Sequence, residues 1–182
     1  MNTNHRRPDA SADLHVETSA LRRQAGQMIR VQRSLPAPAD LGVDMIAVPE
    51  GSSIDIDLRL ESVVEGILVT GTAEVVLEGE CSRCLTPIEG HRAFDLQELY
   101  FYPDREAEED VLRVGDDDTV DLDPVLRDAV VLNLPFNPLC QPDCLGLCPD
   151  CGVNLNDDPD HDHGDRIDPR WAALQEFGPT ES

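Results

Sequence analysis

The stretch SIDIDLRLESVVEGILVTGTAEVVL, residues 53–77, decides the fold class. From Ile54 to Leu60 every second residue is apolar and the residues between are charged, which is typical of a strand with one buried face. After a break at Glu65-Gly66, the alternation resumes from Ile67 to Leu77. The stretch therefore predicts two antiparallel strands that are joined by a short turn and place one face in the core.

The segments that follow extend this sheet and add a helix. Residues 88–101 carry apolar side chains at Phe94, Leu96 and Tyr100, which predicts a third strand. Asp123 as N-cap and Pro124 at the first helical position predict a short helix over 124–132, whose apolar face packs on the sheet. We therefore expect an α+β fold, an antiparallel β-meander sheet with a short packed helix.

The segment before the first predicted strand has a weaker pattern. Residues 14–33 indicate a short helical turn near Leu21 and then a mixed segment that ends before Pro36. Residues 1–13 are polar, without a period that could bury a face, and we expect a disordered tail there. Residues 103–118 are highly charged and predict a loop.

The charge of the chain is unevenly distributed. The 182 residues carry a net charge of −23, but residues 1–33 hold six Arg and three acidic residues, a net charge of +3. Residues 34–182 hold eight Arg and 34 acidic residues, a net charge of −26. An acidic body repels phosphate and attracts basic proteins. If the protein contacts RNA directly, the contact should therefore be made by an arginine cluster. The candidates are Arg22, Arg23, Arg30 and Arg33.

Six cysteines form the strongest chemical signal. Two lie in CSRC at 81–84 and four in CQPDCLGLCPDCG at 140–152, so the chain holds two CxxC pairs. A tight CxxC turn directs two thiolates at one tetrahedral metal, and two such pairs with further cysteines nearby indicate zinc. A redox dithiol in CSRC is the alternative, but such motifs need a helix N-terminus in a βαβ context. We therefore expect a C-terminal zinc-knuckle region.

The division of the ligands between metals stays open. Two histidines in DPDHDHGD raise the number of candidate ligands to eight, enough for two four-ligand sites. The favoured partition has one site with Cys81, Cys84, Cys140 and Cys144, and another with Cys148, Cys151, His161 and His163. The rival partition has a single local site formed by Cys140, Cys144, Cys148 and Cys151. That rival leaves Cys81 and Cys84 as a free pair.

Several of these motifs together resemble one protein family. They are the step from a strand into CSRCL at 77–85, VDLDPVLRDAVVLNLP at 120–135, CQPDCLGLCPDCGVNLN at 140–156 and IDPRWAAL at 167–174. They resemble the YceD-like family of large ribosomal RNA subunit accumulation proteins, in its cysteine-rich branch. The resemblance implies a single YceD-like domain over 14–156. The residues at 157–182 form an acidic segment with histidines, in which Asp168-Pro169 predicts the start of a short C-terminal helix near 168–177.

The resemblance also implies a function, namely support of ribosome assembly. We expect a protein without enzymatic activity that binds a large-subunit ribosomal protein or precursor large-subunit rRNA, and no small-molecule substrate. The sequence holds no nucleophile elbow, HExxH motif or glycine-rich phosphate loop. A structural zinc-ribbon adaptor is the alternative, and a zinc hydrolase or a thiol oxidoreductase using the CxxC pair is a weaker one. Because no signal h-region or apolar run of about 20 residues occurs, we expect a cytoplasmic protein that does not enter the membrane.

Overall fold

A computed structural model describes residues 14–21 and 23–163 of the chain, and its elements form an α+β fold. The elements are β1 (His15–Glu17), the 3-10 turn η1 (Ser19–Leu21), β2 (Met28–Pro36), β3 (Gly42–Val43), β4 (Ile46–Ala47), β5 (Ser53–Ser62), β6 (Gly66–Glu80), β7 (Pro87–Phe101), β8 (Thr119–Asp121) and α2 (Asp123–Val131). The antiparallel meander expected from residues 53–101 is confirmed as β5, β6 and β7. The predicted tail at 1–13 and the predicted helix near 168–177 lie outside the described residues.

The main sheet is built around β6. All 15 residues of β6 pair with β7, from Gly66 opposite Phe101 to Glu80 opposite Pro87. On its other side β6 pairs first with β5 and then, near its end, with β4. β2 pairs with β5 along its whole length and extends the sheet beyond the meander. At about 3.3 Å per residue, the β6–β7 hairpin is roughly 50 Å long and runs the length of the sheet.

A glycine in the middle of β6 allows β5 to approach closely. Gly71 has a φ of +151°, a conformation that L side chains rarely adopt. A Cβ atom at this position would lie 2.1 Å from the carbonyl oxygen of Asp57 on β5. Gly71 therefore fixes the contact between the two strands at the centre of the sheet.

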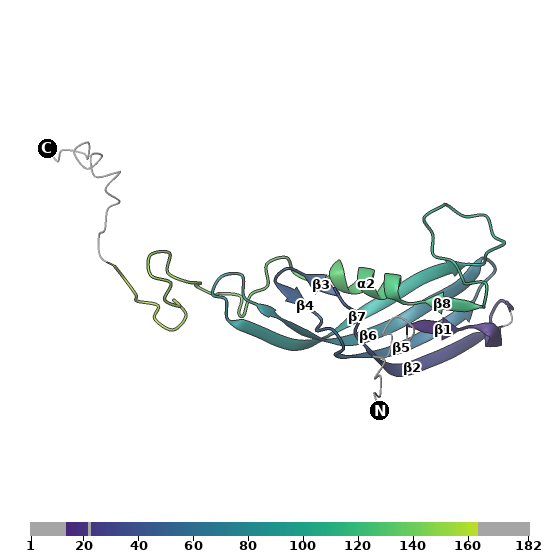
Figure 1. Cartoon of the computed structure of the whole chain (residues 1–182), viewed down its shortest axis with the longest axis horizontal. Coiled ribbons are helices and arrows are strands. Elements are labelled where there is room, and N and C mark those ends of the chain that lie inside the picture. The colour runs from purple at the N-terminus through teal and green to yellow at the C-terminus, as the bar shows by residue number, and fades with distance from the viewer. Residues whose placement is uncertain (1–13, 22, 164–182) are drawn as a thin grey trace, which may run out of the picture.

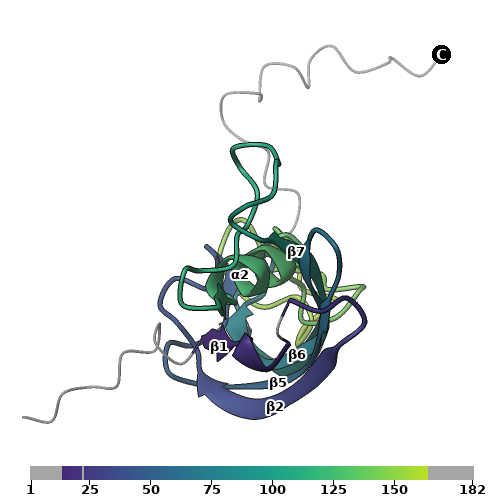
Figure 2. The ribbon, with the colours of Figure 1, turned by 90° about the vertical axis from the view of Figure 1, so that its right-hand side faces the viewer.

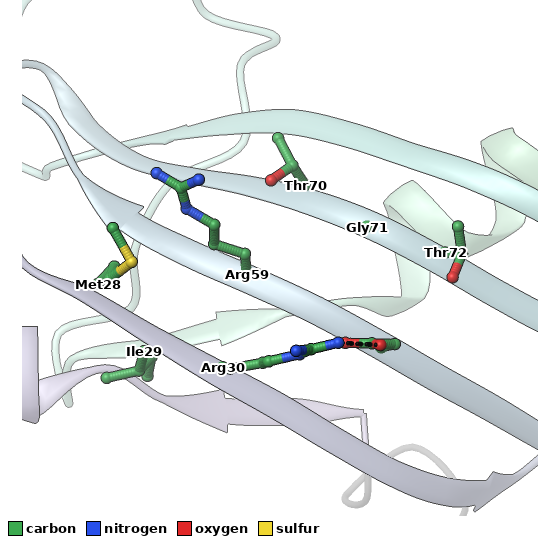
Figure 3. Close-up of a pocket in the computed structure, with 8 residues that line it drawn as sticks. Met28, Ile29, Arg30, Arg59, Thr70, Gly71 and Thr72 are labelled. Carbon is green, nitrogen blue, oxygen red and sulfur yellow. Dashed lines mark hydrogen bonds and ion pairs between the residues drawn. The ribbon is translucent and has the colours of Figure 1, made fainter.

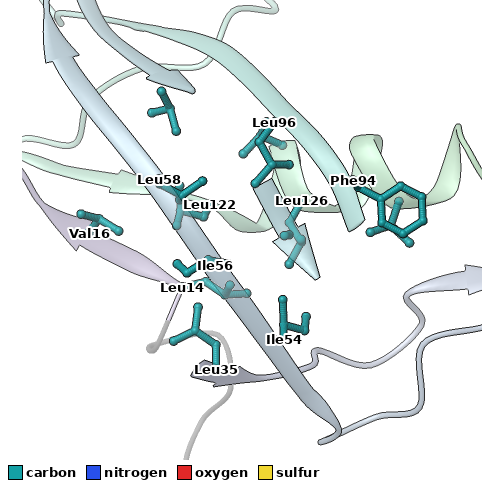
Figure 4. Close-up of a cluster of buried hydrophobic side chains, with 14 of the residues drawn as sticks. Leu14, Val16, Leu35, Ile54, Ile56, Leu58, Phe94, Leu96, Leu122 and Leu126 are labelled. Carbon is teal, nitrogen blue, oxygen red and sulfur yellow. The ribbon is translucent and has the colours of Figure 1, made fainter. Parts of the chain in front are cut away.

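The inner face of the sheet forms the core with α2 and the β1–β8 ribbon. Figure 2 shows the sheet curving beneath α2, with β1 beside it. The buried side chains are mostly Leu, Ile and Val, as the low aromatic content of 4% requires. Figure 4 labels part of this cluster: Leu14, Val16, Leu35, Ile54, Ile56, Leu58, Phe94, Leu96, Leu122 and Leu126. Burial of such side chains contributes about 1.5–3 kcal/mol each, so this cluster is the main source of stability.

The helix and the ribbon are fixed by specific contacts. The Tyr100 hydroxyl on β7 donates a hydrogen bond to the Asp121 carbonyl on β8 (2.6 Å). The prediction that Asp123 caps α2 is wrong by one residue, because the N-cap is Leu122, without a side-chain cap. Asp123 lies in the first turn, where its backbone N–H donates to the Asp121 carboxylate (3.0 Å) and its carboxylate pairs with Arg127 (3.3 Å). This acid still stabilises the positive end of the helix.

Two segments without regular structure lie at opposite ends of the sheet. Residues 103–118 form the charged loop that the sequence predicts, and it projects where β7 ends (Figure 1). Residues 140–163 lie beyond the other end, where β6 turns into β7. In the described part of the chain no helix is long and apolar enough to cross a membrane.

Candidate metal centre

Four cysteines converge where the β6–β7 hairpin meets the segment after α2. The members of this first cluster are Cys81, Cys84, Cys140 and Cys144, and their sulfur atoms all lie within 4.8 Å of one another. Cys81 Sγ lies 3.7 Å from Cys144 Sγ, and Cys84 Sγ lies 3.5 Å from Cys140 Sγ. Tetrahedral zinc with bonds of about 2.3 Å would place two sulfurs about 3.8 Å apart. The sulfurs are therefore spaced as a single tetrahedral metal requires, and all four are free thiols.

Backbone hydrogen bonds hold the two halves of the first cluster together. The CSRC turn closes on itself, because Cys81 N–H donates to the Thr86 carbonyl (2.9 Å). It is joined to the other segment by Ser82 N–H donating to the Pro138 carbonyl (2.8 Å). The Arg83 guanidinium donates to the Cys144 carbonyl (2.8 Å), so both sides of the cluster are positioned by groups that are not ligands.

The thiols of the first cluster differ in acidity. Burial opposes ionisation of Cys81, but hydrogen bonds from backbone groups, first that of Cys140, lower the pKa of its thiol to about 6. The side chain of Thr86 lowers the pKa of Cys84. The pKa of Cys140 is raised to about 12, first by the shared hydrogen bond with Cys84 and then by burial. A metal ion would displace the proton that these thiols share, because metal binding requires thiolates.

A second cluster lies further along the chain. Its members are Cys148, Cys151, His161 and His163, with all ligand atoms within 4.8 Å of one another. Cys148 Sγ lies 3.3 Å from His163 Nε2, and Cys151 Sγ lies 3.1 Å from His161 Nε2. These separations suit a Cys2His2 site with tetrahedral geometry. Cys151 is exposed and both histidines are half-buried, so this cluster is more open to solvent than the first.

Two residues that sequence reasoning missed support the clusters. The Asn156 amide donates to Cys144 Sγ (3.4 Å), and its oxygen accepts from Leu145 N–H (2.9 Å), so Asn156 holds the turn that carries a ligand. Asp158 lies 3.6 Å from His161 Nδ1, the ring nitrogen that faces away from the cluster. Carboxylates in this position orient metal-binding histidines. The NLN motif at 154–156 is the only sequence signal that marks Asn156.

All eight predicted ligands thus fall into two groups, and either group could hold a metal ion. The grouping coincides with the two-site partition and separates the cysteines that the single local site would combine. Occupancy by zinc stays a prediction. The CSRC motif lies in a turn at the end of a β-hairpin, and a helix N-terminus does not precede or follow it.

The predicted arginine cluster is not gathered on one surface. Arg22 lies outside the described residues. Arg23 pairs with Asp118 (3.4 Å), at the end of the charged loop. Arg30 and Arg33 are three residues apart on β2 and point to opposite faces of the sheet, since side chains alternate along a strand.

Arg30 lies instead in a groove on the outer face of the sheet. The groove has a volume of about 580 Å³ and is lined by residues of β2, β5 and β6 (Figure 3). Arg30 donates two hydrogen bonds to the Asp57 carboxylate (2.8 and 2.6 Å). Hydrogen bonds from Arg30 and then from Gln32 lower the pKa of Asp57 to about 2. Phosphate would have to displace this carboxylate from the guanidinium.

Comparison with known proteins agrees with these features. The family model described as large ribosomal RNA subunit accumulation protein YceD matches residues 69–178. The chain belongs to the YceD family. The match covers most of β6, all of β7 and α2, and both clusters, so the metal-ligand candidates lie in the part of the chain that matches the family model.

Several uncharacterized proteins are similar to this YceD chain. One of Mycobacterium tuberculosis (strain ATCC 25618 / H37Rv) is 45% identical over 176 residues, covering 94% of this chain and 84% of the relative. One of Mycobacterium leprae (strain TN) is 41% identical over 165 residues, covering 88% and 76%. The protein YlbN of Bacillus subtilis (strain 168) is 28% identical over 99 residues, covering 53% and 58%. No solved structure matches the chain.

Proposed function

We propose that the protein is a non-enzymatic factor that supports the accumulation of large-subunit ribosomal RNA by binding a basic large-subunit ribosomal protein. The observation that carries this proposal is membership of the YceD family, whose description supports a ribosome-related role. The family description does not name a partner. The choice between protein and RNA therefore rests on the charges of this chain.

The distribution of charge favours a basic protein over bare precursor rRNA. Residues 34–182 carry a net charge of −26, which repels a phosphate backbone. The described arginines of the predicted cluster are engaged within the chain, Arg23 with Asp118 and Arg30 with Asp57. Arg33 donates to the His15 carbonyl (3.0 Å). Free ribosomal proteins are basic because they bind RNA, and an acidic surface is complementary to them.

We further propose that both clusters hold zinc in a structural role. Four cysteines, or two cysteines and two histidines, complete the tetrahedral shell of zinc and leave no open position for a substrate. Zinc would stabilise residues 140–163, which have few apolar contacts of their own within the described part of the chain. A catalytic zinc keeps three protein ligands and an open site, and these ligand sets are those of closed sites. The protein would accordingly have no small-molecule substrate.

Affinity capture from cells tests the proposed function. Full-length tagged protein should enrich large-subunit precursor particles over mature subunits, and purified protein should bind RNA-free large-subunit proteins. Because the attraction is electrostatic, binding should weaken as salt rises, with a screening length of about 10 Å at 0.1 M. Tight, salt-resistant binding to bare large-subunit rRNA would contradict the proposal, especially if it survives alanine at Arg22, Arg23, Arg30 and Arg33. Enrichment of another machine, without ribosomal precursors, would favour a zinc-ribbon adaptor.

A further inference from the structure

Large apolar side chains are exposed around the first cluster. We define the metal lobe as residues 81–86 and 136–163. Leu85 is 54% exposed, Phe136 81% and Leu145 55%, and these three side chains are called the apolar surface of the lobe. Each comes from a different segment: the CSRC turn, the chain after α2, and the turn after Cys144. Three of the six large apolar side chains that are exposed in the described part of the chain therefore belong to this lobe, and exposed apolar side chains gather at interaction sites.

The three segments are held together at the cluster. Leu85 follows Cys84 and Leu145 follows Cys144, and both cysteines belong to the first cluster. Phe136 lies two residues before Pro138, whose carbonyl accepts from Ser82 N–H. Pro138 is buried while Phe136 is exposed, so the backbone is anchored and the aromatic ring still faces solvent. A ring presented from an anchored backbone loses little conformational entropy when it binds.

The charge around the apolar surface has one sign. Residues 136–163 carry six Asp and no Arg or Lys. The basic side chain of the 81–86 turn, Arg83, donates to the Cys144 carbonyl. A partner that covers the apolar surface therefore approaches a lobe whose charged side chains, apart from Arg83, are carboxylates, and these six aspartates are called its acidic rim. Basic side chains complement this rim, whereas phosphates and a second copy of this acidic chain are repelled.

We propose that the apolar surface of the metal lobe docks a basic protein segment that carries apolar side chains. The proposal rests on the proposed function and names the surface through which it acts. Phe136, the most exposed of the three side chains, is the aromatic anchor of this contact. The aspartates at the rim steer the basic segment, which makes association faster at low salt.

A photo-crosslinking amino acid placed in the full-length protein tests this docking in cells. Position 136 is the test site. Position 64 is the matched control, because Val64 is 61% exposed and lies in the β5–β6 turn at the other end of the β6–β7 hairpin. Crosslinks from position 136 to a basic protein, absent from position 64, are the expected result. Crosslinks from 136 to RNA, to a second copy, or to residues 164–182 of the same chain would each overturn the proposal, as would equal crosslinking from both positions.

Binding in vitro gives an independent measurement. The probe is the total protein of the large ribosomal subunit, extracted free of RNA, and the full-length protein is zinc-loaded. Phe136→Ser should weaken binding about tenfold, the usual effect of removing an aromatic anchor, and Val64→Ser should leave it unchanged. Equal affinity of Phe136→Ser and wild type would overturn the docking surface. Absence of binding by the wild type would instead refute the proposed function, and a crosslink from 136 to some other basic protein would then leave the surface standing.

Discussion

Loss of one ligand of the first cluster should unfold the metal lobe and leave the sheet intact. In Cys84→Ser three ligands remain at the first site, which should then lose its metal, and the link between residues 84 and 140, which are 56 positions apart, is broken. By the loop-closure relation for cross-links, a link of this span contributes about 4 kcal/mol, or roughly a thousandfold in an opening equilibrium. The lobe has little to replace it, because among the described residues the apolar cluster around these cysteines adds Leu139 and Leu147 of the lobe and Ile88 of β7.

Hydrogen exchange at individual amides measures this change. The amide of Leu147 donates to the Arg83 carbonyl (3.1 Å) across the two segments and should exchange roughly a thousandfold faster in Cys84→Ser. Amides of β5 and β6 should change little, since their pairing does not involve the lobe. Cys151→Ser is the matched control. It should expose the amide of Cys148, which donates to Val153 within the second cluster, and spare Leu147.

Native mass spectrometry of the same proteins tests whether the faster hydrogen exchange accompanies the loss of a metal ion. The wild type should carry two zinc ions, and each single substitution should leave one. A wild type with one zinc, retained after both His161 and His163 are changed to Ala, would refute the two-site arrangement. Equal loss of protection across the sheet in Cys84→Ser would refute the view that the lobe and the sheet are stabilised separately.

Further predictions concern the sheet and the acidity of the cysteines. Gly71→Ala should lower the free energy of unfolding by about 2–4 kcal/mol in urea titrations, since the added Cβ meets the Asp57 carbonyl. Gly90→Ala should leave the free energy of unfolding unchanged, because nothing lies within 4 Å of an added Cβ there. Leu58→Ala should cost about 2–5 kcal/mol by the same measurement, because Leu58 is fully buried; a cost under 1 kcal/mol would mean that the core rearranges. Zinc release, followed with a chromogenic chelator, should rise as the pH falls. The pKa of the Cys81 thiol is lowered to about 6, below its ordinary value. Its thiolate therefore stabilises the fold fully at a pH above the ordinary pKa, and this stabilisation is lost as the pH falls through about 6. Zinc release that increased as the pH rose would contradict this prediction.

The sequence predicts the strands best where each has one buried and one exposed face. β5 alternates throughout, and β6 alternates from Ile67 onward except at Gly71, so the period of two places both strands. The sequence of β2 does not predict a strand, because Arg33 occupies an inner-face position, where it donates to the His15 carbonyl. The short strands β3 and β4 are too brief for any period to be recognised.

The candidate ligands were predictable because metal sites need particular atoms at particular spacings. The CxxC spacing alone marks the cysteines as candidate metal ligands. The histidines are added because two four-ligand sites need eight ligands. Asn156 and Asp158 were missed because amide and carboxylate side chains near a metal site are recognised only from their contacts. Arg23, Arg30 and Arg33 do not form the predicted cluster, for a related reason. Closeness along the chain does not bring Arg23, Arg30 and Arg33 to one surface when a turn and an alternating strand separate them.

The ligands of the first cluster lie far apart along the chain, so they become available at different times during synthesis. Strands β5, β6 and β7 are consecutive, so they can pair as soon as Phe101 has left the ribosome. Cys81 and Cys84 cannot form the first cluster before Cys140 has been made. Cys140 is 56 residues after Cys84, and synthesis of this length takes about 3–11 s at bacterial rates. Until then the CSRC turn is an exposed dithiol that any thiophilic metal or oxidant can reach. The first cluster therefore cannot close before Cys144 has been made, and the second cannot close before His163 has been made.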